Sequence, residues 1–215
     1  MEETNINLHS ASISEIQSFF KDATVFITGA TGFLGHVLLS KLLRSCSNIK
    51  EIYILLREKK GKTAINRFNE LLEDEVFEVL RNECPESLLK IKPIIGDCLE
   101  IGLGLSFNDT EMIKKNVNVI FHVAATVKFD TPIKKAVHMN IRSTSDLLDL
   151  AHEIKELKTG GATGLVDAGI RNADPKCAGL INLAEVDAGG SCLKWTPCWP
   201  DVISRPTWSR AELDE

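Results

Sequence analysis

The stretch VFITGATGFLG, residues 25–35, passes from an apolar run directly into a turn that carries Gly29, Gly32 and Gly35. A continuous apolar run of this length is typical of a strand that is buried on both faces. After the glycines, apolar residues recur at helical spacing as far as Arg44. The stretch therefore predicts a strand, a glycine-rich turn and a helix, in that order.

This order is the arrangement that binds the pyrophosphate of a dinucleotide. One glycine permits the tight turn, another lets main-chain N–H groups approach the pyrophosphate, and the third lets the helix pack closely on the strand. The negative phosphates then lie at the positive end of the helix. The alternative is an ordinary strand-to-helix turn that is rich in glycine.

Strand and helix patterns alternate along the chain on both sides of this turn. Short apolar runs predict four strands, at residues 23–28, 51–56, 89–97 and 117–125. Helical spacing of apolar residues predicts helices at residues 33–44, 63–81 and 139–158. The alternation predicts an α/β fold, a Rossmann-like doubly wound parallel sheet with right-handed crossovers. We expect the sheet to be incomplete, with about four strands.

The composition changes abruptly near Lys158. All nine Phe, all five His and the single Tyr lie before it, whereas all three Trp and four of the seven Pro lie after it. We therefore treat residues 1–158 as one domain and residues 159–215 as a divergent C-terminal tail. The tail has few aliphatic clusters and many Gly and Pro residues, so we expect it to be irregular or disordered.

Charge and cysteine usage exclude several classes of protein. The net charge of −5 argues against binding to nucleic acid, because no basic face dominates. No long apolar window predicts a transmembrane segment, and the polar N-terminus MEETNINLHS is unlike a secretory signal. The six cysteines form no CxxC pair, as in a reduced chain. We expect an intracellular protein without a metal site.

Four segments carry a family resemblance. They are FFKDATVFITGATGFLGHVLLSKLLRSC (19–46), IYILLREKKGKTAINRFNELL (52–72), IIGDCLEIGLGLS (94–106) and VIFHVAATVKFDTPIKKAVHMNIRSTSDLLDLA (119–151). In this order and spacing they resemble the N-terminal half of alcohol-forming fatty acyl-CoA reductases, in the extended short-chain dehydrogenase/reductase superfamily. The resemblance covers about residues 17–158. It implies an NADP-binding Rossmann-type domain over residues 1–158.

The resemblance implies roles for individual residues near the glycine turn. The positions that match the family's phosphate turn are Gly29, Thr31, Gly32, Phe33, Leu34 and Gly35. Arg57 closes the second strand, where an NAD-specific fold usually places an acidic residue. Its planar guanidinium suits the 2′-phosphate of NADPH, and Lys59, Lys60 and Lys62 add to the local positive field. The alternative is a solvated arginine at the end of a strand.

Further positions match the family at the ends of the later strands. Asp97 and Cys98 match positions beside the adenine ring, although Asp97 also suits an ordinary turn. Ala124, Ala125 and Thr126 end the fourth strand, where small side chains leave room for a cofactor. Asn140 matches a family asparagine on the long helix, and a role as the helix N-cap accounts for it equally well.

The resemblance implies reduction of a fatty acyl-CoA to the alcohol, through the aldehyde, by two hydride transfers from NADPH. The superfamily uses a Tyr-x-x-x-Lys pair, in which Tyr donates a proton and Lys lowers the Tyr pKa. The only tyrosine here, Tyr53, lies within the second predicted strand, so we assign no catalytic residue. If the chain is nevertheless active, His122, Lys128 and His138 are the first candidates.

Three interpretations follow from this missing pair. The chain is a truncated or mis-spliced reductase with an intact nucleotide-binding half, a non-catalytic nucleotide-binding module with a new tail, or an enzyme of another reductase branch. The lack of any Tyr after Tyr53 argues against the third. Full-length family members associate with peroxisomal or endoplasmic-reticulum membranes, and we expect this chain to lack such an anchor.

Overall fold

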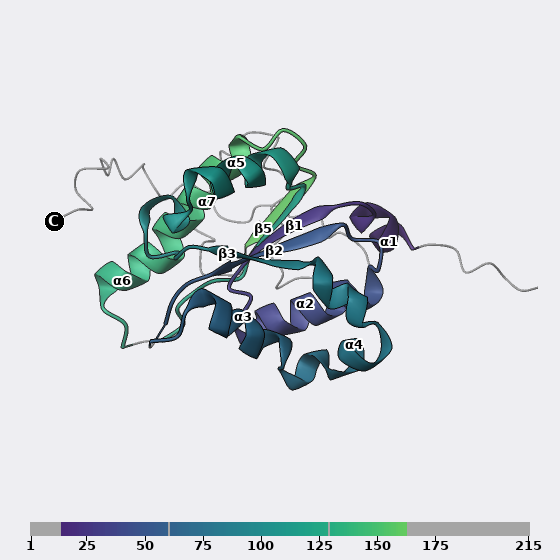
Figure 1. Cartoon of the computed structure of the whole chain (residues 1–215). Helices are drawn as coiled ribbons and strands as arrows, with labels where there is room; N and C mark the ends of the chain where they lie inside the picture. Colours follow the sequence, from purple (N-terminus) through teal and green to yellow (C-terminus); the bar gives the residue numbers. More distant parts are fainter. Residues whose placement is uncertain (1–13, 60, 129, 163–215) are drawn as a thin grey trace, which may run out of the picture. The chain divides into compact units, whose positions relative to one another are not determined.

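The structure is a computed structural model that describes residues 14–59, 61–128 and 130–162. Its centre is a parallel five-stranded sheet in the order β3-β2-β1-β4-β5 (Figure 1). The strands are β1 (Thr24–Thr28), β2 (Glu51–Leu56), β3 (Ile91–Ile95), β4 (Val119–His122) and β5 (Thr159–Ala162). The order runs outward from β1 in both directions, which confirms the predicted Rossmann-like, doubly wound sheet.

Helices cover both faces of this sheet (Figure 1). One face carries α2 (Phe33–Ser45), α3 (Ala64–Leu72) and α4 (Glu78–Glu83), and the other carries α5 (Phe107–Asn116), α6 (Ile133–Val137) and α7 (Ser143–His152). The remaining elements are α1 (Glu15–Phe20), η1 (Glu75–Phe77), η2 (Pro85–Lys90), η3 (Ile101–Gly104) and η4 (His138–Arg142).

Strand β1 separates two hydrophobic cores. All five of its residues are buried, as the continuous apolar run predicted. Val25 and Ile27 pack into the core that includes α2 residues, whereas Phe26 packs into the core that includes α5 and α7 residues. Alternate side chains of a strand point to opposite faces, so one short segment supports both layers of helices.

The sheet has one strand more than the sequence predicted. Residues 159–162, with the sequence TGGA, pair with β4 in parallel, and Thr159 lies opposite Val119. Parallel pairing requires only main-chain N–H and C=O groups, which glycine supplies as well as any residue. A strand can therefore form without an apolar pattern, and it begins directly after the predicted boundary at Lys158. The rest of the predicted tail, residues 163–215, lies outside the described residues.

Two predicted helices differ from those observed. The predicted helix at 63–81 is divided into α3, η1 and α4, because the Asp74 side chain accepts the N–H of Val76 and caps a new turn. The predicted helix at 139–158 begins earlier, after Pro132, and ends at His152. Its central turn, η4, is a π-helix. Asn140 lies inside this helical run, so the prediction that it is an N-cap is wrong.

Candidate functional site

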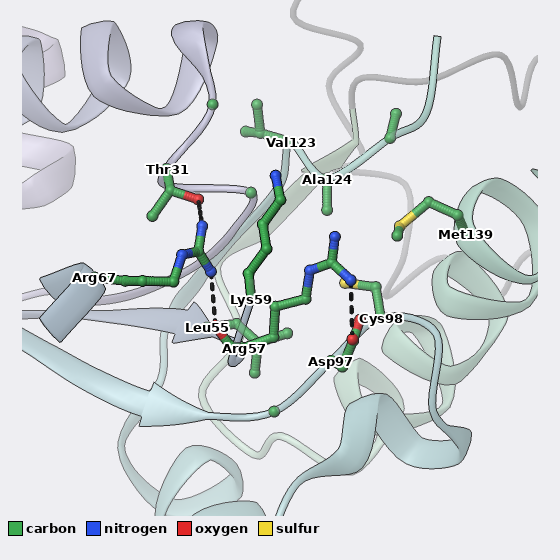
Figure 2. Close-up of a pocket in the computed structure, with 14 residues that line it drawn as sticks. Thr31, Leu55, Arg57, Lys59, Arg67, Asp97, Cys98, Val123, Ala124 and Met139 are labelled. Carbon is green, nitrogen blue, oxygen red and sulfur yellow. Dashed lines mark hydrogen bonds and ion pairs between the residues drawn. The ribbon is translucent and has the colours of Figure 1, made fainter. Parts of the chain in front are cut away.

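A cavity of about 250 Å³ opens at the carboxyl ends of the central strands (Figure 2). Eight of the residues predicted to bind a cofactor line it: Gly29, Thr31, Gly32, Arg57, Asp97, Cys98, Ala124 and Ala125. The cavity lies beside the point at which the strand order reverses, between β1 and β4. Open α/β sheets bind their ligands at this position.

The three glycines of the turn differ in what surrounds them. Gly29 has φ +75°, and a Cβ there would lie 2.4 Å from the main-chain N of Ala124. A Cβ on Gly35 would lie 2.3 Å from the carbonyl oxygen of Gly29, so this glycine lets α2 pack against the turn. Gly32 caps α2 and lines the cavity, and the one neighbour a Cβ would approach is the Gly29 oxygen at 3.3 Å. Gly29 thus allows the tight turn, Gly35 allows the helix to pack, and Gly32 leaves the approach to the helix N-terminus open.

Four predicted residues lie outside the lining of this cavity. Gly35 is buried between helix and turn. Phe33 and Leu34 begin α2 with exposed side chains, 82% and 56% exposed, so only their main-chain N–H groups suit an anion at the helix N-terminus. The main chain of Thr126 is bound by Asn140, whose Oδ1 accepts the Thr126 N–H at 2.8 Å and whose Nδ2 donates to the Thr126 carbonyl at 3.0 Å.

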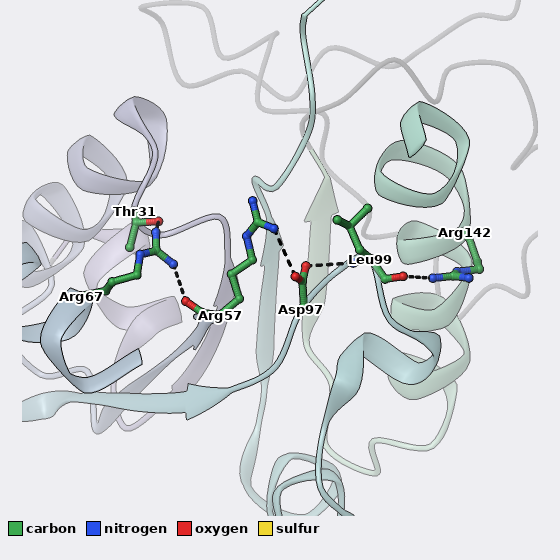
Figure 3. Close-up of polar contacts among 6 residues, drawn as sticks. All are labelled: Thr31, Arg57, Arg67, Asp97, Leu99 and Arg142. Atoms are coloured by element: carbon green, nitrogen blue, oxygen red, sulfur yellow. Dashed lines mark hydrogen bonds and ion pairs between the residues drawn. The ribbon is translucent and has the colours of Figure 1, made fainter. Parts of the chain in front are cut away.

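Arg57 and Asp97, which end neighbouring strands, pair with each other. Arg57 Nη1 lies 3.2 Å from Asp97 Oδ2, and both side chains are partly buried (Figure 3). The other carboxylate oxygen, Asp97 Oδ1, accepts the N–H of Leu99 at 3.0 Å. The carboxylate is therefore a turn residue and the partner of Arg57 at once.

A second arginine, Arg67 of α3, joins this site from ten residues further along the chain. Its Nη1 donates to the Arg57 carbonyl and its Nη2 donates to Thr31 Oγ1, each at 2.7 Å (Figure 3). Burial lowers the pKa of Arg67, and the neighbouring Arg57 charge lowers it further. Arg67 thus ties the glycine turn to the end of β2 and brings a second guanidinium to the cavity.

The sequence analysis missed five of the lining residues: Leu55, Arg67, Gly96, Val123 and Met139. Lys59 also lines the cavity and was expected there only as part of a positive field (Figure 2). Arg67 and Met139 reach the site from helices. A polar residue on a helix resembles ordinary surface, and a flexible apolar residue resembles ordinary core. No local sequence pattern therefore identifies Arg67 and Met139 as site residues. Leu55, Gly96 and Val123 flank strand ends, and that placement could have identified them.

Several chemically reactive residues are held in unreactive environments. Burial raises the pKa of Cys98 to about 12, so its thiol stays protonated at neutral pH. Tyr53 is buried within β2 and donates to Glu51 Oε2 at 2.8 Å, and burial raises its pKa to about 12.

Within the described ranges, no group of three or more His, Cys, Asp and Glu side chains could hold a metal ion. No helix in the same ranges is long and apolar enough to span a membrane.

Known protein sequences match the part of the chain that carries the cavity. An NAD-binding family described as male sterility protein matches residues 27–160. Fatty acyl-CoA reductase wat of Drosophila melanogaster is 43% identical over 145 residues, and human fatty acyl-CoA reductase 1 is 42% identical over 143 residues. These alignments cover 67% and 66% of this chain but only 28% of each relative. The chain therefore spans less than a third of the length of these curated relatives.

Two solved structures with a similar fold are reductase domains of biosynthetic enzymes. The terminal R domain of the myxalamid PKS-NRPS pathway matches with a TM-score of 0.54 and 29% identity, over 66% of this chain and 35% of that one. The reductase domain of a non-ribosomal peptide synthetase from Mycobacterium tuberculosis matches with a TM-score of 0.53 and 27% identity, over 66% of this chain and 32% of that one.

Proposed function

Because the chain belongs to the male sterility protein family of NAD-binding domains, we propose that its pocket binds NADPH for the reduction of a fatty acyl-CoA. The family resemblance that the sequence analysis identified is confirmed over residues 27–160. The preference for NADPH, the individual contacts and the alcohol product are parts of the proposal. The proposal rests on one observation: an open glycine turn and two guanidinium groups lie at the same cavity.

The residues around the cavity fit the two charged parts of such a cofactor. Gly32 leaves the N-terminus of the 13-residue helix α2 open to a pyrophosphate, whose negative charge is favoured there. Arg57, Lys59 and Arg67 line the next part of the cavity and suit a 2′-phosphate. Asp97 offsets part of the Arg57 charge through their ion pair, and Lys59 and Arg67 leave the lining with net positive charge.

The remaining predicted contacts fit the neutral parts of the cofactor. We assign Asp97 and Cys98 to the surroundings of the adenine ring, and Ala124 and Ala125 to the wall beside the ribose and nicotinamide. In a complete reductase of this family, bound NADPH would supply the hydride that reduces the acyl-CoA. The chain's own residues bind and orient it, and the small side chains at the end of β4 leave space beside the glycine turn.

For the 215-residue chain we expect binding with little or no turnover. Its single tyrosine, Tyr53, is buried in β2 and bound to Glu51, away from the lining of the cavity. A positioned general acid contributes about 10²–10⁴-fold to such a reaction. We propose that this chain by itself acts as the nucleotide-binding part of a reductase.

The test is a titration of the chain with NADPH and with NADH. We expect NADPH to bind at least tenfold more tightly, because a charge-assisted contact contributes about 1.5–3 kcal/mol. Arg57→Ala should remove most of this preference. Lys62→Ala is the matched control, since Lys62 is a nearby lysine that pairs with Glu70 and does not line the cavity. Equal affinities for NADPH and NADH in the unaltered chain would contradict the assignment.

A second assay addresses turnover. The chain is incubated with NADPH and a long-chain acyl-CoA, and fatty alcohol is measured by mass spectrometry, with a full-length relative as the positive control. We expect no alcohol above background. Alcohol at a rate near that of the control would contradict the expected lack of turnover, although not the binding of NADPH.

A further inference from the structure

A buried histidine lies behind the cavity and is not one of its lining residues. His122 ends β4 and is 2% exposed. Its Nδ1 lies 2.6 Å from the hydroxyl of Thr28, and its Nε2 lies 3.3 Å from the hydroxyl of Ser143. Thr28 ends β1 and Ser143 begins α7, so the imidazole joins two strands and a helix. The proposed function gives this ring no task.

The two hydroxyls lead from the ring to residues that do line the cavity. Thr28 Oγ1 accepts the main-chain N–H of Ala124 at 3.4 Å, and Ser143 Oγ donates to the main-chain carbonyl of Met139 at 2.5 Å. Ala124 and Met139 both line the cavity (Figure 2). A continuous hydrogen-bonded path therefore links the main chain of these two residues through the ring.

The direction of each hydrogen bond follows from the two ends of this path. A carbonyl only accepts, so the Ser143 proton points at Met139 and Ser143 Oγ must accept from His122 Nε2–H. The other ring nitrogen, Nδ1, then carries no proton and accepts from the Thr28 hydroxyl, whose oxygen in turn accepts from Ala124 N–H. One neutral tautomer, with the proton on Nε2, satisfies the whole path.

The position of Ala124 matters because the glycine turn lies directly against it. The hypothetical Cβ of Gly29 would lie 2.4 Å from the Ala124 nitrogen, so the two main-chain segments are as close as glycine permits. A shift of Ala124 toward the turn would displace Gly29, and a shift away would open the wall of the cavity. The hydrogen bond from the Ala124 N–H to Thr28 Oγ1 therefore acts together with the bond from the Val123 N–H to the Thr28 carbonyl, at 3.1 Å, to set the distance between the two walls.

We infer that His122 is a positioning residue for the dinucleotide pocket. Through Thr28 and Ser143, its ring ties the turn after β4 to helix η4. This inference rests on the proposed function of the pocket. Burial lowers the pKa of His122 to about 4, so the ring is neutral at physiological pH, as the path requires. His122 acts through Thr28 and Ser143 on the main chain of Ala124 and Met139, and it is not among the residues that line the cavity.

The first measurement uses the free, isotope-labelled 215-residue chain. Nitrogen chemical shifts of the imidazole should report a neutral ring with the proton on Nε2 at pH 7, and Ser143→Ala should raise the fraction with the proton on Nδ1. Thr28→Val should speed amide exchange at Ala124 about tenfold, because the N–H loses its acceptor. Thr24→Val is the matched control, since Thr24 is the other buried threonine of β1, at the far end of the strand. A proton on Nδ1, or unchanged exchange in Thr28→Val, would overturn the inference.

The second measurement is the affinity of the same variants for NADPH and NADH. Thr28→Val should weaken both by about tenfold, because a displaced wall affects the shared part of the two dinucleotides. Thr24→Val should change neither. Equal affinities in Thr28→Val and Thr24→Val would overturn the inference and leave the proposed function standing. If the unaltered chain binds no NADPH, the proposed function fails and the assignment of His122 to a dinucleotide pocket fails with it.

Discussion

The two sides of the pocket are built from different kinds of interaction. We call one side the cationic side. Its partly buried side chains make charge-assisted contacts with one another, and they belong to Thr31, Arg57, Arg67 and Asp97. These contacts join the glycine turn to the ends of β2 and β3. Long side chains at a partly open site can be exchanged with little effect on the core, so this side can set charge preference independently of the fold.

On the other side, which we call the neutral side, Thr28, His122 and Ser143 are buried and uncharged. Their hydrogen bonds end on the main chain of Ala124 and Met139. Buried polar groups that lose a partner are costly, so this side is coupled to folding. Under the proposed function, the cationic side selects among dinucleotides and the neutral side maintains the shape of the pocket.

The largest effect is expected where the two sides meet. Gly29→Ala places a methyl group 2.4 Å from the Ala124 nitrogen at a residue with φ +75°. We expect the free energy of unfolding to fall by about 3–5 kcal/mol, from overpacking together with backbone strain. Urea denaturation measures this. Gly32→Ala is the control within the same turn, and it should change stability by less than about 1 kcal/mol, because its φ of −93° suits any residue and the Gly29 oxygen, 3.3 Å from the added methyl group, has to move only slightly. Similar losses for both variants would contradict the separate roles of these glycines.

The next effect concerns pH and the neutral side. Burial lowers the pKa of His122 from 6.5 to about 4. Between these values the unfolded chain binds a proton that the folded chain does not, so stability is retained above pH 6.5 and falls as the pH drops toward 4. The loss should approach about 3 kcal/mol.

The matched variant for this prediction is His122→Gln, which offers a donor and an acceptor without titrating. Urea midpoints between pH 7 and pH 4.5 compare the two chains. The stability of the unaltered chain should fall more steeply than that of the variant. Parallel pH profiles would show that His122 is not buried in the neutral form.

A smaller effect is expected on the cationic side, and on selectivity rather than stability. Arg67→Met removes the donor to Thr31 and one guanidinium from the cavity. The ratio of NADPH to NADH affinity should fall by about tenfold, which corresponds to roughly 1.4 kcal/mol. Arg81→Met is the control, because Arg81 likewise donates two hydrogen bonds, to the main-chain carbonyls of Leu72 and Asp74, but does not line the cavity. An equal fall in the ratio for both variants would argue against a local role for Arg67.

The smallest effect distinguishes two asparagines that bridge main-chain groups at opposite ends of the sheet. Asn140 binds both main-chain groups of Thr126, and Asn118 binds the Thr24 N–H and the Glu156 carbonyl. Each change to Ala should lower stability by about 1 kcal/mol. Only Asn140→Ala should also weaken NADPH binding, because Thr126 follows the wall formed by Ala124 and Ala125. Equal NADPH affinities in the two variants would show that the segment after Ala125 does not affect the pocket.

The fold was predictable because its signals are local. The apolar run before Gly29 predicts a buried strand, and the glycine spacing predicts the turn and the start of α2. The predicted strand at 51–56 matches β2 at both ends. Even the pairing of Arg57 with Asp97 is consistent with two polar residues at the ends of neighbouring parallel strands.

The parts that could not be predicted depend on contacts between distant segments. Strand β5 has no apolar signal, since it pairs through main-chain groups alone. Arg67 looks like a surface residue of α3 until the helix folds back toward Thr31. Asn140 resembled a cap, but the helix begins earlier and its side chain binds the loop after β4. His122 was considered only as a reactive candidate, whereas its burial and partners give it a positioning role in our account.

The central claim is that the carboxyl edge of the sheet is the dinucleotide site. It is tested most directly by amide hydrogen exchange of the chain with and without saturating NADPH. We predict protection at residues 29–35, 57–67, 96–98 and 123–126, with no change at the amino ends of the strands near residues 21–24 and 116–118. Protection at the amino ends, or none at the glycine turn in a chain that binds NADPH, would contradict the account.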